Sequence, residues 1–227
     1  MKKDLSGKTL GIIHAAVFTA QTVQKYIDEI IPEVQVLHCG DDSVQRDNFL
    51  APVGTIPKHN YYKFITFARF LQEAGADLIM LACSTFNSAV EVARPVIDVP
   101  LLQIDRPMME LAVKQGNRVG LLATVPSTVP ASERLLQQVA QEAGKDIKIE
   151  TVLCSEAFKV LRAGDTAKHN QMLLEAIYDL SKKVDAICMA QVSMSVLEPY
   201  LTNMPVPVYN SGRTGFERVR QMLEEMS

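Results

Sequence analysis

Apolar, β-branched runs alternate with amphipathic segments along the whole chain, which predicts a protein of alternating strands and helices. We expect strands over 9–14, 34–38, 77–82 and 100–104, and helices over 20–31, 61–74, 88–93 and 106–115. The run 77–82 is apolar on both faces, which is typical of a central strand in a parallel sheet. Gly75 and Gly116 follow two of the expected helices, where a glycine commonly ends a helix.

The second half of the chain repeats the first. The motif that begins at Gly7 (GKTLGII) is echoed at Gly116 (GNRVGLL), 109 residues later, and DLIMLA at Asp77 is echoed by DAICMA at Asp185. VPLL at 99–102 is echoed by VPVY at 206–209. Three ordered matches at a nearly constant offset indicate a duplicated unit of about 110 residues.

The duplication defines the expected architecture. We predict an α/β protein of two pseudo-symmetric parallel-sheet lobes, the first formed by 1–104 plus 206–227 and the second by 105–205. Ligands of open α/β sheets bind at the carboxyl ends of the strands. The active site is therefore expected in the cleft between the lobes.

Composition excludes several classes of protein. The chain has 227 residues, a formal charge of -3 and no basic run, which argues against nucleic acid as a partner. No apolar stretch is long enough for a membrane helix, and no secretory pattern opens the chain, so we expect a cytoplasmic protein without a membrane partner. The four cysteines are too widely spaced for a disulfide framework or a metal motif, so no metal is expected.

Cys83 is the strongest candidate for chemistry, because it follows the apolar run 77–82. Ser84, Thr85 and Asn87 come next and are helix-capping residue types. A thiol at the start of a helix is shifted towards thiolate, and the surrounding N–H groups and hydroxyls suit a carboxylate. The alternative interpretation is a small buried cysteine beside an ordinary cap.

Other strand ends carry further candidates. His14 ends the first strand, where it could act as the base of a Cys83–His14 pair, or could simply be a hydrogen-bonded histidine. Thr124 and Thr128 follow the equivalent strand of the second half, where their hydroxyls suit an anion or a helix cap. Arg46, in an expected loop after the second strand, is the charged residue chosen to orient a second carboxylate. Lys58, His59, Lys168 and His169 are weighed for the same role.

Over nearly its whole length the chain resembles the aspartate/glutamate racemase superfamily. The resemblance lies in GADLIMLACST, which contains Cys83, and in VGLLAT with Thr128. It implies two α/β lobes, no cofactor, a small carboxylate substrate and a homodimer. Racemases of the family use two cysteines on opposite faces of the substrate's α-carbon, and glutamate racemases place an acidic residue where this chain has His14.

The second cysteine of that pattern is missing from its expected position. Cys83 stands six residues after Asp77, whereas six residues after Asp185 stands Gln191. Cys188 falls in the middle of the strand and should be buried, and Cys39 and Cys154 are interpreted as structural residues at duplicated strand ends. A glutamine cannot relay a proton. We therefore expect a substrate-binding surface opposite Cys83, formed by Gln191, Ser193, Thr124 and Thr128.

Three functions follow. The first is a cofactor-independent racemase-like isomerase that moves a proton at the carbon next to a carboxylate. The second is a one-cysteine decarboxylase, isomerase or lyase of the same superfamily, which Gln191 favours. The third is a small-carboxylate-binding protein without catalysis.

Overall fold

The computed structural model describes residues 3–226 and divides into two compact units, residues 1–104 with 212–227 and residues 105–211. The expected boundary at 205–206 needs correction. Strand β8 (Val208–Asn210) pairs with β7 (Ala186–Met189), and the segment 206–211 belongs to the second unit.

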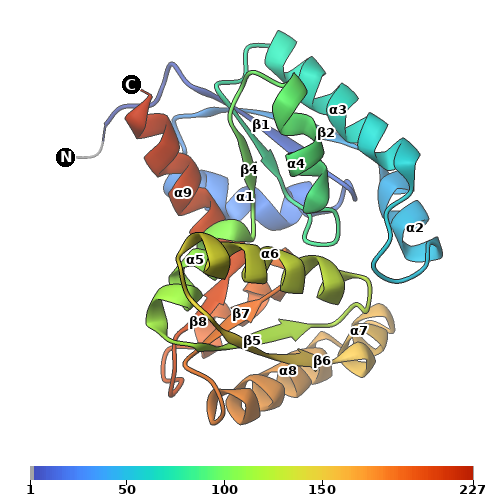
Figure 1. Ribbon diagram of the computed structural model, residues 1–227, viewed down its shortest axis with the longest axis vertical. Helices are drawn as coiled ribbons and strands as arrows, with labels where there is room; N and C mark the ends of the chain where they lie inside the picture. Colours follow the sequence, from blue (N-terminus) through green and yellow to red (C-terminus); the bar gives the residue numbers. More distant parts are fainter. Residues whose placement is uncertain (1–2, 227) are drawn as a thin grey trace. The chain divides into compact units, whose positions relative to one another are not determined.

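The first unit is a four-stranded parallel sheet in the order β2-β1-β3-β4, with helices packed on it (Figure 1). Its elements are β1 (Thr9–His14), α1 (Thr19–Ile30), β2 (Gln35–Gly40), α2 (Asp42–Leu50), α3 (Lys58–Glu73), β3 (Leu78–Leu81), α4 (Ser88–Ala93), η1 (Arg94–Val96), β4 (Leu101–Gln103) and, from the end of the chain, α9 (Ser211–Glu225).

The second unit has the same topology, with the strand order β6-β5-β7-β8. Its elements are α5 (Arg106–Gln115), β5 (Arg118–Ala123), α6 (Thr128–Glu142), β6 (Lys148–Leu153), α7 (Ser155–Arg162), α8 (Thr166–Ser181), β7, the 3₁₀ helix η2 (Val192–Tyr200) and β8. The predicted α/β class and the duplicated parallel sheets are confirmed.

The two units share details of their packing. The Asp77 carboxylate accepts a hydrogen bond from the Thr9 backbone N–H at 2.8 Å, and Asp185 accepts one from the Arg118 N–H at 2.9 Å. Each aspartate ties the start of one strand to the start of its neighbour. These equivalent contacts support the interpretation that one unit was duplicated.

The strands and helices predicted in the first half lie close to their expected positions. Helix α3 illustrates the reason for this agreement. Phe64, Ala68 and Leu71 are buried on its inner face, as the apolar spacing predicts. Gly75 follows the helix with a φ of 88°, the left-handed conformation that glycine adopts without strain. Helix α3 begins at Lys58, directly after Pro57, so Lys58 and His59 lie in its first turn and not before it.

Helix α9 packs on the first unit. Its Phe216 ring stacks on Tyr26 of α1 with a centroid distance of 5.9 Å, and Arg213 pairs with Glu29 at 2.9 Å. Within residues 3–226, no helix combines the length and apolar character that a membrane crossing requires.

Candidate active site

Cys83 lies two residues beyond the end of β3, in a turn that leads to α4. The thiol is half-buried and packs against the core cluster that contains Phe64 and Phe86. Ser84 and Asn87 are buried, and Thr85 is half-buried. The turn therefore carries Cys83 and all three of its predicted polar neighbours.

The helix predicted over 88–93 is confirmed as α4. The expectation that Cys83 lies at the start of a helix is wrong, because α4 begins five residues later, at Ser88. Asn87 precedes the helix in αR conformation and makes no side-chain capping bond. Helix-dipole effects fade within the first turn. Activation of Cys83 by the N-terminus of α4 therefore has no geometric support.

His14 is buried, and each of its ring nitrogens has a partner. Nδ1 lies 2.6 Å from the Thr19 hydroxyl, and Nε2 lies 2.9 Å from Nδ1 of His38 on β2. The Thr19 hydroxyl donates to the backbone oxygen of Ala16 at 2.7 Å. Because that carbonyl can only accept, the hydroxyl proton points to it, and the hydroxyl oxygen accepts from His14 Nδ1–H.

This chain of bonds assigns the tautomers of both rings. With its proton on Nδ1, neutral His14 accepts at Nε2 from His38 Nδ1–H. Burial, reinforced by the neighbouring His38, lowers the pKa of His14 to about 4, and burial also lowers the pKa of His38. Both rings are therefore neutral at pH 7. The series of hydrogen bonds ends at the exposed His38 ring, whose Nε2 lone pair can accept a further proton.

The predicted Cys83–His14 pair is not formed. Thr19 and His38 occupy both nitrogens of His14, so His14 can take a proton from the thiol only by giving up one of these bonds. Strand alternation also separates the two residues: Cys83 packs on the sheet face that carries Ile13, whereas His14 extends from the opposite face.

In the second unit, Gln191 lies two residues beyond β7 and bonds to Thr124 at the end of β5. The Gln191 side-chain oxygen accepts from the Thr124 backbone N–H at 2.6 Å and from the Thr124 hydroxyl at 2.8 Å. These two donors hold the carbonyl end of the amide, so its NH₂ group is directed away from them. Gln191 is thus set as a hydrogen-bond donor that does not titrate.

The strand registers make Cys83 and Gln191 equivalent. Leu81 pairs with Ile13 in the first sheet and Met189 pairs with Leu122 in the second, and each candidate follows its strand by two residues. Ala82 N–H donates to the Ile13 oxygen and Ala190 N–H to the Leu122 oxygen, both at 2.9 Å. The register derived from the sequence is therefore correct.

Cys188 is a core residue. It lies inside β7 beside Leu121, is fully buried, and its sulfur is 3.8 Å from the Met108 backbone oxygen. Burial, with the nearby Asp105 carboxylate as the second cause, raises the pKa of its thiol. Cys188 therefore stays protonated in the core.

Cys39 and Cys154 are half-buried, and burial raises the pKa of both thiols. The expectation that they stand at equivalent, duplicated positions is wrong. Asp41 N–H donates to the His14 oxygen as Cys154 N–H donates to the Ala123 oxygen, so the counterpart of Cys154 is Asp41. Cys39 lies inside β2, one residue before its end.

The remaining candidate binding residues differ in burial and in the element that carries them. Thr124 and Thr128 are buried, Thr128 opens α6 without a side-chain cap from Ser127, and Ser193 is half-buried in η2. Arg46 belongs to α2 and not to a loop; its side chain is 67% exposed and pairs with Asp47 at 2.8 Å.

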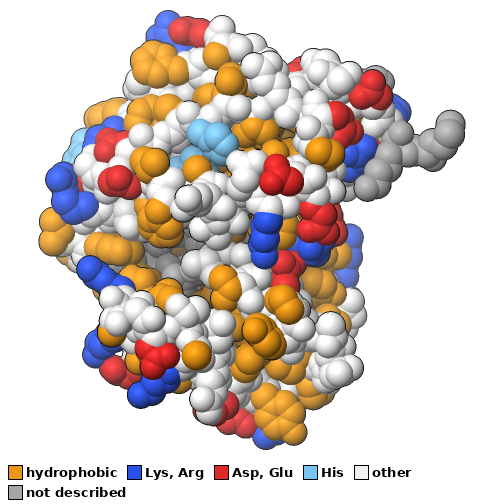
Figure 2. Space-filling view, turned by 180° about the vertical axis from the view of Figure 1, so that it is seen from behind, with side chains coloured by type: hydrophobic (Ala, Val, Ile, Leu, Met, Phe, Trp, Pro, Cys, Tyr) orange, Lys and Arg blue, Asp and Glu red, His pale blue; other side chains and the backbone are white. Residues whose placement is uncertain are grey.

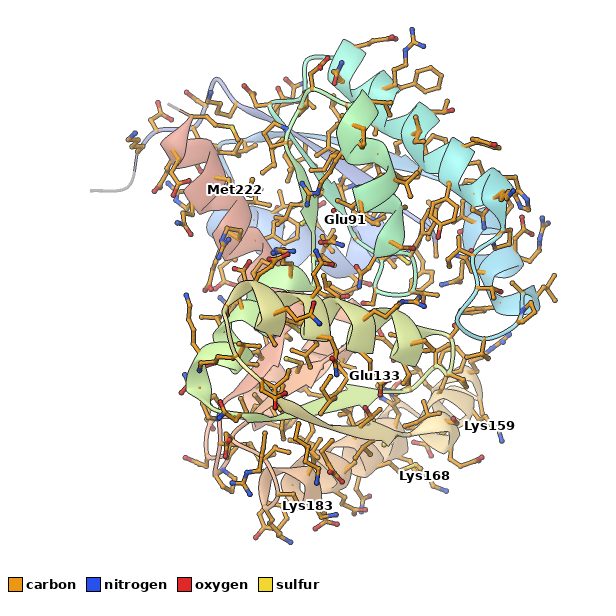
Figure 3. All side chains as sticks on the ribbon, in the orientation of Figure 1. Glu91, Glu133, Lys159, Lys168, Lys183 and Met222 are labelled. Atoms are coloured by element: carbon orange, nitrogen blue, oxygen red, sulfur yellow. The ribbon has the colours of Figure 1, made fainter. Side chains whose placement is uncertain are left out.

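The charged residues weighed beside Arg46 lie in the first turns of α3 and α8. His59, on α3, also pairs with Asp47, at 2.9 Å. Lys168 is exposed near the start of α8 and points away from the sheet of its own unit (Figure 3), whereas His169 is buried. Histidine side chains reach the surface shown in Figure 2, in agreement with the exposure of His38 and His59.

The sequence analysis did not identify the two hydrogen-bond partners of His14, Thr19 and His38. Thr19, which orients His14, stands 109 residues before Thr128, so the repeat could have identified it. His38 lies in a predicted strand, but nothing in the sequence indicates that its ring meets His14. Among residues 3–226, no group of three or more His, Cys, Asp and Glu side chains could hold a metal ion.

The fold and the strand-end residues define a duplicated α/β protein with a thiol in one unit and a glutamine at the equivalent position of the other. Comparisons with known proteins identify its family. The model of the Asp/Glu/hydantoin racemase family matches residues 54–219, and the chain belongs to this family. It is therefore assigned to the racemase-type isomerases.

The relatives agree with this assignment. Glutamate racemase from Streptococcus pneumoniae is 22% identical over 96% of this chain and 81% of its own length. Glutamate racemase isoform RacE1 from Bacillus anthracis has a similar structure, with a TM-score of 0.73, 19% identity, and coverage of 98% of this chain and 84% of that one. An aspartate racemase homologue from Pyrococcus horikoshii has a TM-score of 0.72 and 19% identity, and the match covers 95% of this chain and 99% of that one.

Proposed function

We propose that the chain is a cofactor-independent enzyme that moves a proton at the carbon next to a carboxylate of a small acid or amino acid, with Cys83 as the acting thiol. Family membership supports the reaction class. The observation that carries the assignment of Cys83 is the equivalence of Cys83 and Gln191 at matching strand ends. Cys39, Cys154 and Cys188 have pKa values raised by burial, which disfavours them as bases.

In the proposed reaction, the Cys83 thiolate removes the α-proton and becomes a thiol, and the electron pair of the C–H bond passes into an enolate. The same thiol then returns a proton to the carbon. The Gln191 NH₂ group, held in direction by Thr124, donates a hydrogen bond to the carboxylate or enolate. Thr85, Ser84, Asn87, Thr128 and Ser193 remain the predicted binding groups.

The absence of a second thiol at position 191 favours chemistry on one face of the substrate. A glutamine cannot deliver a proton, so exchange should proceed without change of configuration. A one-thiol decarboxylase, isomerase or lyase is consequently the second candidate. The amino acids named for the relatives, glutamate and aspartate, are the first substrates to test.

The decisive measurement is α-hydrogen exchange in D₂O, followed by proton NMR and chiral chromatography. Both enantiomers of aspartate and glutamate and a set of substituted malonates are incubated with the protein. Cys83→Ser should lower turnover by a factor of about 10³ or more, since it removes the acid–base group. Cys154→Ser, at a half-buried thiol that also follows a strand, is the matched control and should keep activity.

Each outcome decides between the functions. Exchange with retention supports one-face chemistry, whereas racemisation by the parent protein refutes it and leaves a two-base racemase. Gln191→Cys should add racemisation, because the Thr124 N–H and hydroxyl that now bond to the glutamine would stabilise a thiolate. Binding of these acids without any turnover would refute the enzyme and leave a binding protein.

The homodimer and the cytoplasmic location implied by the resemblance remain predictions. Light scattering of the purified protein would test the first, and cell fractionation the second.

A further inference from the structure

Gln103 connects β4 to the turn that carries Cys83. It is the last residue of β4, pairs with Leu81 of β3 and is 2% exposed. Its side-chain Nε2 donates to the backbone oxygen of Asn87 at 3.0 Å. Asn87 closes the turn that begins at Cys83, so a side chain from the neighbouring strand holds the far end of this turn.

The turn has other anchors besides Gln103. Ala82 N–H bonds to Ile13 before the turn. Phe86 packs edge-on against Phe64 with a centroid distance of 5.9 Å, and the Tyr61 hydroxyl lies 3.0 Å from that of Ser88. Gln103 adds a polar link from the turn to the sheet itself.

The second unit has an amide at the equivalent position. Asn210 ends β8, pairs with Met189 and is 6% exposed, and its Nδ2 donates to the Glu198 carboxylate at 2.9 Å. Glu198 lies in η2, which follows Gln191. Each unit thus has a buried amide that ties the last strand to the segment after the preceding strand.

Packing alone does not explain Gln103. The residues before it, Leu101 and Leu102, are apolar and buried, as the core requires. The Gln103 Oε1 atom is buried without a hydrogen-bond partner among residues 3–226. An apolar side chain would avoid this desolvation cost, so the benefit of Gln103 lies in the bond that its other end makes to Asn87.

We propose that Gln103 is a positioning residue for Cys83: its bond to Asn87 holds the turn in the conformation that sets the place and exposure of the thiol. The effect on catalysis rests on the proposed function, whereas the effect on the thiol does not. A shift of about 1 Å at a reacting atom can lower a rate by up to about 10²-fold. The geometry of this turn is therefore under tight functional constraint.

The test uses the alkylation rate of Cys83, which requires no substrate. In a parent protein with Cys39→Ala and Cys154→Ala, Cys83 is the accessible thiol, because Cys188 is fully buried. Gln103→Met keeps the length of the side chain and removes the donor. We expect iodoacetamide to modify Cys83 at least about threefold faster in this variant, because the turn opens, and kcat to fall about tenfold or more with a smaller change in KM.

Two further variants distinguish positioning from general stability. Asn210→Leu removes the equivalent amide of the second unit and should leave Cys83 alkylation within about twofold of the parent. In Gln103→Glu the bond to Asn87 can form only with a protonated carboxyl. The ratio of its alkylation rate to that of the parent should therefore return towards one as the pH is lowered.

Equal effects of Gln103→Met and Asn210→Leu on Cys83 would overturn the proposal, as would an unchanged alkylation rate in a folded Gln103→Met protein. If Gln103→Met does not fold, the pH dependence of Gln103→Glu decides in its place. If Gln103→Met changes the alkylation rate of Cys83 but the parent protein turns over none of the tested acids, the positioning role stands and the proposed function is refuted.

Discussion

At the scale of single residues, one backbone carbonyl determines the protonation of two histidines. Ala16 accepts from Thr19, Thr19 accepts from His14, and His14 accepts from His38. The bonds all run in one direction, so a proton added to the pair enters at the exposed His38 ring. His14 then acts as the group that orients His38.

The depressed pKa of His14 predicts that stability depends on pH. The unfolded chain binds a proton near pH 6.5, whereas the folded protein binds it only near pH 4, so stability is complete above 6.5 and falls as the pH drops to 4. The loss is about 3 kcal/mol at most. Urea unfolding at pH 7.5 and pH 4.5 should show it, and a folded His14→Phe variant should lose most of the difference. An unchanged slope in that variant would contradict the assignment.

The sequence could identify these side chains but not their partners. Cys83 and Gln191 can be recognised from the repeat, because each stands six residues after an equivalent aspartate, Asp77 or Asp185. His14 was recognised by its place at a strand end, yet its contacts with Thr19 and His38 depend on a turn and on a neighbouring strand. The partner of a side chain depends on tertiary geometry, and a pattern in one strand does not contain it.

At the scale of the elements, close helix–sheet packing repeats in the two units. A Cβ added at Gly11 would lie 2.9 Å from a Leu71 side-chain atom, and one added at Gly120 would lie 2.8 Å from a Leu180 side-chain atom. Leu71 belongs to α3 and Leu180 to α8. Both strands therefore need glycine where a helix crosses them.

Gly11→Ala and Gly120→Ala should each destabilise the protein by about 1–3 kcal/mol, because the extra methyl group overpacks a buried contact. Gly7→Ala is the matched control, since nothing lies within 4 Å of its added Cβ. Urea denaturation of the three variants measures the differences. A loss at Gly7 as large as at Gly11 would contradict the packing argument.

Helix α2 shows where pattern reading fails. The sequence predicts a loop around Arg46, in the segment 41–48, whereas the structure has a helix over Asp42–Leu50 whose buried residues are Val44 and Asn48. The local signal was present, since the Asp41 side chain caps the helix by accepting from the Ser43 N–H at 2.8 Å. Strongly periodic α3 was predictable, whereas a short polar helix depends on its cap and its neighbours.

At the scale of the whole molecule, the repeat organises the chain into two units with the same strand order. The alternating pattern predicts the α/β class, and the constant offset predicts the duplication and the equivalence of Cys83 and Gln191. The boundary predicted between residues 205 and 206 is wrong, because β8 lies beyond it and completes the second sheet.

Only the first unit is discontinuous, and its two segments meet near the chain ends. The Arg220 guanidinium donates to the Lys3 backbone oxygen at 3.0 Å, and the Lys3 ammonium donates to the Glu224 backbone oxygen at 2.7 Å. Lys3 and the end of α9 therefore lie side by side in the first unit (Figure 1).

This proximity allows a circular permutation. A short linker from residue 227 to residue 1, with new ends between Ile104 and Asp105, would make each unit one uninterrupted stretch of chain. The permuted protein should fold with the circular dichroism spectrum of the parent but with a lower free energy of unfolding, because Ile104 and Asp105 are buried and the new charged ends lose hydration. An unfolded product would show that the 104–105 connection is needed. Splitting it after residue 211 would then yield two polypeptides, so that the thiol and the glutamine could be varied and labelled on separate chains.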